Sequence, residues 1–495
     1  MKRYMLNRRD FLTRAGAIGL VFAATRPIYA LSRMLSNSTE NELKLLDFVH
    51  ITDVHITDGT NPLRVEVLDD IPGLDAAWRP QQHMSATALD AVIRSINQQH
   101  AEETFDFMIS TGDMVDNAMQ NEFQWFMDVL NGNIMSDDYL ELVDRDIMTP
   151  VNPQGIEVDI PWYAAIGNHD TMIVGNFPAK LMEAIHKNMK ETYGFEITTQ
   201  EEVIELLFNY GFDMMPENMD GYYSFDPNDY VHCIVLNTNN DNWVEGLIDR
   251  FMSRNRSLIG RLIRLEDSLG RELIIKYILI TFLKWLKTQS QEVVGGIAEG
   301  TLNRDQFEWM KGEIENNSHK LCLIFSHHGP DSFLSPIGNV TPNELRSCLC
   351  SYDNVIAHIY GHNHNNHIVK EESPYGYYWG ISTSSIIEYP QEWRRIAIWD
   401  NGDGTGILSC RMFQHGYSDS LNQSMGDPQS DIDTHIGRVE DRDVDLEFNI
   451  SSSIAENISN NLSQNSDESS VQPSGNDDSA WGLIYAFLRN LFGRR

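Results

Sequence analysis

The stretch LLDFVHITDVHIT, residues 45–57, joins an apolar run to two potential metal ligands, Asp53 and His55. The run is short, rich in β-branched and aromatic residues and followed by polar residues, as buried strands are. Because successive side chains of a strand point to opposite faces, an Asp-x-His pair at its end brings both ligands to the same side. The stretch therefore predicts a buried strand with metal-binding groups at its carboxyl end.

Similar apolar runs recur along the chain, and each ends in a turn that contains a polar residue or glycine. Stretches with helical spacing, such as 84–99 and 304–317, lie between them. The alternation of strands and helices predicts an α/β fold in which helices cover a layered sheet core. The further apolar runs are residues 105–112, 162–167, 232–237, 321–327 and 355–361.

Four of these runs also end in potential metal ligands. Each motif alone is a weak indication, because a histidine beside a strand is more often a hydrogen-bonded core residue than a ligand. Taken together with Asp53 and His55, their order along the chain resembles that of the calcineurin-like metallophosphoesterase family, over about residues 46–413. The four motifs are Gly112-Asp113, Gly167-Asn168-His169-Asp170, His327-His328 and Gly361-His362-Asn363-His364.

The resemblance implies a four-layer α/β/β/α sandwich over about residues 44–416 and a site for two metal ions. Asp53, His55 and His364 would hold the first ion. Asn168, His327 and His362 would hold the second, and Asp113 would bridge both. This mixture of nitrogen and oxygen donors also suits Zn, Mn or Fe better than Mg or Ca on chemical grounds.

Two catalytic assignments follow from the resemblance, and one ligand assignment has an alternative. His169 matches the family's catalytic histidine, which would bind a phosphoryl oxygen or protonate the leaving group. Asp170 would orient the imidazole of His169. Because Gly329 is inserted between the histidine pair and the following proline, His328 remains an alternative to His327 as the metal ligand.

The function implied is metal-dependent hydrolysis of phosphate mono- or diesters by an activated water at a binuclear metal centre. The substrate would be a small molecule or a lipid head group. A net charge of −35 argues against a nucleic acid polymer, because polyanions bind through Lys and Arg. The alternative is a non-catalytic, metal-stabilised envelope binding protein derived from the same family. The chain has a suitable residue at all seven ligand positions and also has His169, which favours the enzyme.

Residues 1–30 have the features of a targeting segment. They combine a basic start, an uncharged run over 15–24 and a small residue, Ala30, at a plausible cleavage point. The pair Arg8-Arg9, followed by Asp-Phe-Leu, resembles a twin-arginine export signal. We therefore expect an exported protein, periplasmic or extracellular.

Other segments interrupt the alternation of strands and helices. Residues 241–300 have apolar residues at helical spacing, which predicts a helical insert. Residues 418–479 are rich in Ser, Asn, Gln and Asp and are predicted to form a disordered acidic linker before an amphipathic segment at 480–495. Because 250–288 and 481–495 each combine an apolar face, tryptophan and local positive charge, we expect peripheral membrane contact through them.

Overall fold

The computed structural model describes most of the chain between residues 42 and 470. The targeting segment predicted at 1–30 lies outside the described residues, so the expected export stays a prediction. The described residues are 42–60, 79–175, 177–178, 198–217, 220–239, 250–259, 298–334, 339–427 and 430–470, with Arg261, Tyr277, Thr281 and Trp285.

The first of two large sheets contains six strands in the order β14-β13-β12-β1-β2-β3. β1 (Leu43–Ile51) is parallel to β2 (Phe107–Ser110), and β2 is parallel to β3 (Trp162–Ala164). These three strands end at the same edge of the sheet, which brings the motifs that follow them together. Antiparallel strands continue the sheet beyond β1: β12 (Glu392–Asp400), β13 (Thr405–Gln414) and β14 (Val444–Asn449).

The second sheet also has six strands, in the order β10-β11-β9-β8-β7-β6. Its two edge strands are antiparallel to their neighbours and its four inner strands are parallel to one another. The histidine motifs after β8 and β9 are therefore placed at one edge too. The bounds are β6 Tyr223–Phe225, β7 Val231–Val235, β8 Leu321–Phe325, β9 Val355–Tyr360, β10 His367–Ser373 and β11 Gly376–Ser382.

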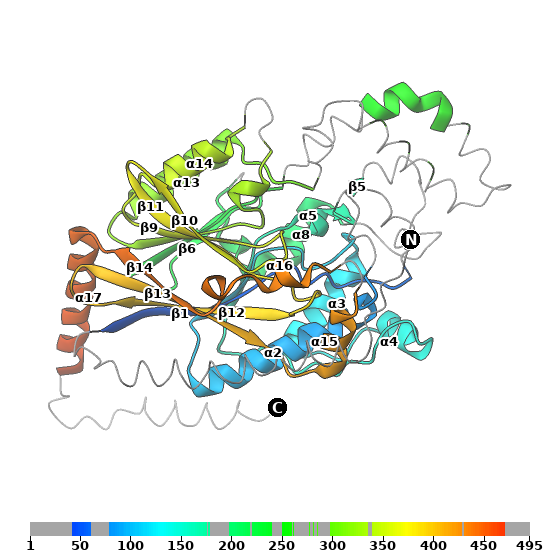
Figure 1. Cartoon of the computed structure of the whole chain (residues 1–495), viewed down its shortest axis with the longest axis horizontal. Coiled ribbons are helices and arrows are strands. Elements are labelled where there is room, and N and C mark those ends of the chain that lie inside the picture. The colour runs from blue at the N-terminus through cyan, green and yellow to red at the C-terminus, as the bar shows by residue number, and fades with distance from the viewer. Residues whose placement is uncertain are drawn as a thin grey trace, which may run out of the picture.

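Helices cover the outer faces of the two sheets (Figure 1). α2 (Ser85–Glu102) and α3 (Gln120–Asn131) lie on the side of the first sheet, and α13 (Arg304–Asn316) and α14 (Pro342–Leu349) on the side of the second. α14 begins at a favourable helix start, because the Thr341 side chain accepts the backbone N–H of Glu344 and a proline occupies the first turn.

The alternation of side chains along β8 connects three of these layers. Cys322 and Ile324 are buried in a cluster with residues of α13 and α14. Leu323 and Phe325 instead join the larger core between the sheets, where the Phe325 ring meets that of Phe48 edge-on at 5.8 Å. The predicted α/β/β/α sandwich is thus confirmed.

The remaining described elements are short, except for the C-terminal helix α17. Several of the short ones lie in the loops that follow the parallel strands, next to the predicted ligands. The full set is η2 (Gln82–Met84), α4 (Asp137–Asp144), α5 (Asn168–Thr171), β4 (Met172–Ile173), β5 (Phe177–Pro178), α8 (Gln200–Leu206), η3 (Phe208–Tyr210), η4 (Phe212–Met214), η5 (Pro330–Ser332), α15 (Ser418–Met425), α16 (Ile432–Ile436), η6 (Val439–Asp441) and α17 (Ser452–Ser470).

The disordered linker predicted over 418–479 is wrong for residues 418–470. β14 pairs with β13 across six residues, and α15, α16 and α17 flank it. The segment is polar on average, but several of its apolar residues are spaced for a strand and a helix, so that they face the core. The domain consequently extends beyond residue 416, and 471–495 lie outside the described residues. The buried apolar residues are Leu446, Phe448, Ile450, Ile454 and Ile458.

Leu446→Ala is expected to lower the free energy of unfolding by about 2–5 kcal/mol, because it removes a core side chain that is 4% exposed. Leu462→Ala is the matched control: this leucine of α17 is 44% exposed, and its loss should cost less than about 0.5 kcal/mol. Urea denaturation of both variants measures the difference. Equally small effects would contradict the packing of β14 into the core.

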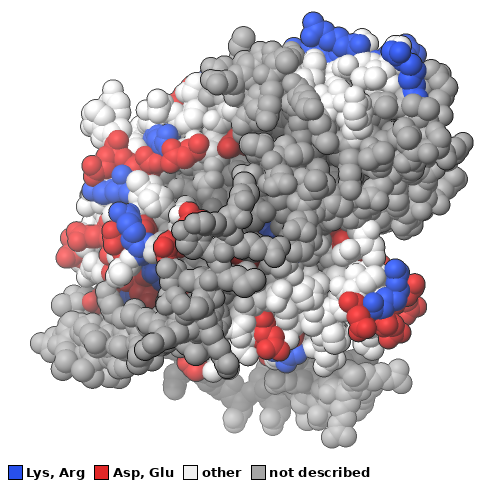
Figure 2. Space-filling view, turned by 45° about the vertical axis from the view of Figure 1, so that its right-hand side comes forward, with Lys and Arg blue, Asp and Glu red and all other residues white. Residues whose placement is uncertain are grey.

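The predicted insert at 241–300 is described only in part. Residues 250–259 are helical, with Phe251 and Ile259 buried and arginines such as Arg254 and Arg256 exposed. Lys and Arg side chains gather at the upper right of Figure 2, where this helix lies. Among the described residues, no helix is both long and apolar enough to cross a membrane. The expected membrane contact rests mainly on residues outside the described part and stays a prediction.

Candidate metal centre

The structure brings together all seven predicted ligands, which come from loops after five parallel strands. Asp53 and His55 follow β1, Asp113 follows β2 and Asn168 follows β3 in the first sheet. The second sheet contributes the histidines that follow β8 and β9, namely His327, His362 and His364. Because the strands of both sheets end on one side of the sandwich, residues more than 300 positions apart become neighbours.

Five of these residues have a left-handed backbone. Non-glycine residues adopt such φ values rarely, at a cost on the order of 1–3 kcal/mol each, and only where the surrounding structure holds them. Strain gathered in one place is typical of functional sites, where it aims side chains that a relaxed backbone would direct elsewhere. The φ values are 52° at Asp53, 50° at His55, 51° at Asp113, 68° at His362 and 54° at His364.

The first predicted subsite has two histidine nitrogens that face one another. His55 Nε2 and His364 Nε2 are 3.1 Å apart, and Asp53 Oδ1 lies 3.2 Å from His364 Nε2. The Nδ1 of each ring is 2.9 Å from a carboxylate oxygen, on Asp116 for His55 and on Glu388 for His364. A carboxylate only accepts, so each Nδ1 carries a proton and Nε2 of each ring faces inward, where it can bind a cation when the ring is neutral.

This arrangement fits a cation. Two ring nitrogens 3.1 Å apart need either a shared proton or a bound cation between them. Asp53 Oδ1 points to the same place and is buried without a hydrogen bond among the residues that the structure describes, and such an atom in a native protein calls for an explanation. His55, His364 and Asp53 offer ligand atoms that all lie within 4.8 Å of one another.

The second subsite has the same design. His327 donates Nδ1–H to the Thr111 carbonyl at 2.7 Å, which turns Nε2 toward Asn168 Oδ1 at 3.0 Å and Asp113 Oδ2 at 3.2 Å. The amide nitrogen of Asn168 donates to the Gly175 carbonyl, so its oxygen faces the site. His362 belongs to the same group of potential ligands.

The geometry favours His327 over His328 as the ligand. His328 Nδ1 lies 2.8 Å from the Thr238 hydroxyl, and its Nε2 lies 2.8 Å from the Ala298 carbonyl. Both ring nitrogens are therefore occupied in hydrogen bonds. Burial, with His362 and His327 nearby, also holds the pKa of His328 well below its usual value, as expected for a neutral structural histidine.

Asp113 lies between the two subsites. Its Oδ2 is 3.2 Å from His327 Nε2 and 3.8 Å from His55 Nε2, and its side chain is buried. Burial opposes ionisation, but the neighbouring His327 and His169 lower the pKa of Asp113 below its usual value. Burial likewise opposes the charged histidines, yet carboxylates raise the pKa of His327 to about 9 and of His364 to about 10. The same negative field would attract a divalent cation.

His169 is positioned beside the centre, at the start of α5. Its side chain is 12% exposed, Nδ1 donates to the Asp116 carbonyl at 2.9 Å, and Nε2 lies 4.0 Å from Asp113 Oδ2. Gly175 packs against the ring with φ +62°, and a Cβ there would come within 2.3 Å of Nε2. The ring thus has a fixed orientation and one edge that a substrate can reach.

The role predicted for Asp170 needs correction. Its buried carboxylate accepts hydrogen bonds from the backbone N–H groups of four residues, so it fixes the loops that carry Asp113 and Asn168. The His169 Nδ1 instead lies 2.9 Å from the Asp116 carbonyl oxygen and 3.4 Å from the Asp116 carboxylate. An adjacent aspartate suggested orientation of the ring, but side chains of neighbouring residues in a helix diverge. The four donors to Asp170 are the N–H groups of Asp113, Met114, Val115 and Gly167.

Sequence reasoning missed the two carboxylates that orient the histidines, Asp116 and Glu388. Asp116 follows Asp113 in the same loop, so its proximity to the centre could have been noticed. Glu388 lies after β11 and belongs to none of the five motifs. Its contact with His364 depends on how the loop between β11 and β12 lies against the residues that follow β1, where Ile386 N–H bonds to the Thr52 and Asp53 carbonyls, and no local pattern records this.

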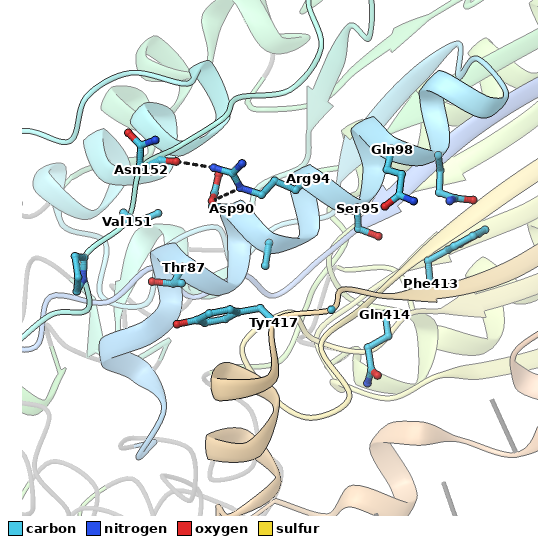
Figure 3. A pocket seen from close by; sticks show the side chains of 14 residues that line it. Thr87, Asp90, Arg94, Ser95, Gln98, Val151, Asn152, Phe413, Gln414 and Tyr417 are labelled. Carbon is cyan, nitrogen blue, oxygen red and sulfur yellow. Dashed lines mark hydrogen bonds and ion pairs between the residues drawn. The ribbon is translucent and has the colours of Figure 1, made fainter. Parts of the chain in front are cut away.

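A surface pocket of about 610 Å³ lies elsewhere, between α2, the loop at 150–152 and the end of β13. Figure 3 shows Arg94 turned toward Asp90 and Asn152, to which it is bound by an ion pair and a hydrogen bond. Tyr417 and Phe413 line its other side. None of the predicted site residues lines this pocket, so the metal cluster remains the candidate functional site.

Comparison with known proteins gives a family match and several structural similarities. A model of the family described as calcineurin-like phosphoesterase matches residues 46–366. A dimetal phosphatase from Danio rerio is 15% identical with a TM-score of 0.37, covering 76% of this chain and 100% of that protein. No curated protein matches the sequence.

Two other solved structures are similar at a comparable level. Purple acid phosphatase PPD1 from yellow lupin (Lupinus luteus) seeds is 13% identical with a TM-score of 0.33, covering 78% of this chain and 56% of that protein. The structure named PhoD is 8% identical with a TM-score of 0.35, covering 75% of this chain and 69% of that protein.

Proposed function

The chain belongs to the calcineurin-like phosphoesterase family, and from this premise we propose that it hydrolyses phosphate mono- or diesters at a binuclear metal centre. The observation that carries the proposal is the convergence of inward histidine nitrogens and carboxylate oxygens around Asp53 Oδ1, a buried acceptor without a hydrogen bond. Family membership supports metal-dependent hydrolysis of a phosphoester. The proposal also includes the number of bound ions and the roles of individual residues.

The distances support the following ligand roles. Asp53, His55 and His364 would hold one ion, and Asn168, His327 and His362 the other. Asp113, which lies within 4 Å of a histidine from each group, would bridge them. Zn, Mn and Fe suit this donor set. Bound divalent ions supply positive charge that neutralises phosphoryl oxygens and acidifies water near neutral pH.

The protein's own residues would provide orientation and a proton. The carboxylates of Asp116 and Glu388 hold His55 and His364 in the tautomer that a metal needs. His169 presents Nε2 at the accessible side of the cluster, where it could donate a hydrogen bond to a phosphoryl oxygen or a proton to the leaving alkoxide. A binding protein without catalysis, the alternative function, has no need of this accessible imidazole.

Metal content and turnover, measured together, test the function. The full chain loaded with Zn²⁺, Mn²⁺ or Fe²⁺ is assayed against a monoester, a diester and a phospholipid, with a chelated sample as the control. We expect about two ions per chain and turnover of at least one substrate that chelation removes and metal restores. Two bound ions without turnover of any substrate would favour the binding protein.

Bound metal and activity are expected to decrease together as the pH falls. A histidine must be neutral to bind metal, and in the metal-free protein the pKa of His327 is raised to about 9 and that of His364 to about 10. Protons therefore occupy these rings at neutral pH and compete with the metal more strongly in acid. Each displaced proton should change the apparent affinity by about tenfold per pH unit.

Equilibrium dialysis against Zn²⁺ between about pH 5 and pH 9, with turnover measured on the same samples, checks this dependence. Full metal content and full rate retained at about pH 4 would contradict it.

A further inference from the structure

The carboxylates of Asp116 and Glu388 meet at one buried guanidinium. Arg79, whose side chain is 2% exposed, donates from Nε to Glu388 Oε1 at 2.8 Å and from Nη1 to Asp116 Oδ1 at 3.2 Å. Asp116 Oδ1 in turn accepts from His55, and Glu388 Oε2 accepts from His364. Three charged side chains thus connect the two histidines whose Nε2 atoms face each other at 3.1 Å.

Burial makes this connection important energetically. Asp116 and Glu388 are almost fully buried, and a buried charge without an opposite charge nearby is costly. Arg79 supplies that charge and donates a hydrogen bond to each carboxylate. Arg79 therefore holds both acceptors in place beside the two histidines.

Arginine suits this position and lysine does not. The planar guanidinium donates in several directions within one plane, so a single side chain can bind two carboxylates that approach from different sides. The ammonium group of lysine has its three donors on a single atom, so it cannot reproduce the separate Nε and Nη1 contacts that Arg79 makes with two carboxylates. Lysine at position 79 would retain the charge but weaken the link between Asp116 and Glu388.

The C-terminal segment reaches the same carboxylate. His435 of α16 places Nε2 at 3.3 Å from Glu388 Oε2, the oxygen that accepts from His364. The His435 carbonyl accepts the backbone N–H of Asn366, two residues after His364, which fixes α16 against the metal loop (Figure 1). A part of the chain that composition alone marks as a linker is therefore in contact with the metal centre.

We propose that Arg79 is the positioning residue that holds both histidines of the first metal subsite, with His435 supporting Glu388 from the C-terminal segment. The inference rests on the proposed function, since it assumes that Asp53, His55 and His364 bind one of two ions. Loss of Arg79 should weaken one ion selectively, because the described contacts of Arg79 lead to His55 and His364 and not to His327.

Competition between the full chain and a chromophoric chelator for Zn²⁺ tests the inference. In Arg79→Lys we expect one of the two affinities to fall about 10- to 100-fold, as for other partners of metal ligands, while the other changes less than about threefold. Arg395→Lys is the matched control. Arg395 also bridges two carboxylates, Asp47 at 2.8 Å and Glu103 at 2.6 Å, but neither contacts a predicted ligand.

Glu388→Gln provides a second variant should Arg79→Lys fail to fold. It keeps the shape of the side chain, removes the charge, and should weaken the same ion. Wild-type affinity for both ions in the folded variants would overturn the inference, as would equal weakening of both ions in the Arg79 and Arg395 variants. A wild-type chain that binds two Zn²⁺ ions but hydrolyses no phosphoester would remove the proposed function and leave this inference intact.

Discussion

Asp113→Asn is expected to reduce hydrolysis to background and to lower bound metal by at least one ion per chain. Asp113 Oδ2 lies within 4 Å of histidines from both subsites, so a single substitution affects both. The variant loses a negative charge in a buried site, where electrostatic interactions are strong. An asparagine amide can also turn N–H donors toward a cation.

Metal content by elemental analysis and turnover of the best substrate measure the effect of this substitution. Asp128→Asn is a suitable control, because Asp128 of α3 is also buried at 4% exposure, and its carboxylate accepts hydrogen bonds from Gln124 and Asn133, which are not predicted ligands. The control should retain two ions and most of the rate. Normal metal content in Asp113→Asn would show that this residue does not bridge.

The ligand motifs could be read from the sequence because each is local. A strand has a period of two, so Asp-x-His and His-x-His after an apolar run place both side chains on one side, wherever the strand lies. The parallel order of the strands then follows from the alternation with helices. The motifs identified Asp53, His55, His362 and His364 correctly, but all four lie beyond the strand ends with a left-handed backbone, so strand periodicity alone does not explain how their side chains converge.

The residues that orient those ligands could not be predicted from local motifs. Arg79 and Glu388 are 309 residues apart in the sequence and have no shared motif. Their contact exists only because both sheets close around the site. At Asp170 the sequence neighbour was misleading. Its position next to His169 suggested a contact with that ring, but the Asp170 carboxylate accepts hydrogen bonds from backbone N–H groups instead.

The prediction of disorder for the C-terminal segment failed for a different reason. Disorder was predicted from average composition, and Ser, Asn and Asp do dominate residues 418–470. Folding depends on where the apolar side chains fall rather than on how many there are. Leu446 and Phe448 alternate along β14, and Ile454 and Ile458 are one turn apart on α17, so each is buried. A test of periodicity over short windows would have found them.

His169→Ala is expected to lower kcat about 10²- to 10⁴-fold while leaving both metal ions bound, because its proposed role is general acid and not ligand. The ring is oriented by the Asp116 carbonyl and is partly exposed beside Asp113. The loss should be largest for an alkyl phosphate, whose alkoxide needs a proton to leave. It should be much smaller for a nitrophenyl phosphate, whose leaving group is stable as an anion.

The dependence on leaving group separates proton donation from a structural role, since misfolding would reduce turnover of both substrates equally. His232→Ala is the matched control. His232 is similarly buried but pairs with Asp226 and Glu313 at the opposite end of the second sheet. Its loss should therefore not lower the rate for the alkyl phosphate more than the rate for the nitrophenyl phosphate. Full turnover of an alkyl ester by His169→Ala, with two ions bound, would exclude His169 as the proton donor. Loss of metal in that variant would instead identify His169 as a ligand, and the cluster of His55, Asp113 and His169 would then define a third coordination group.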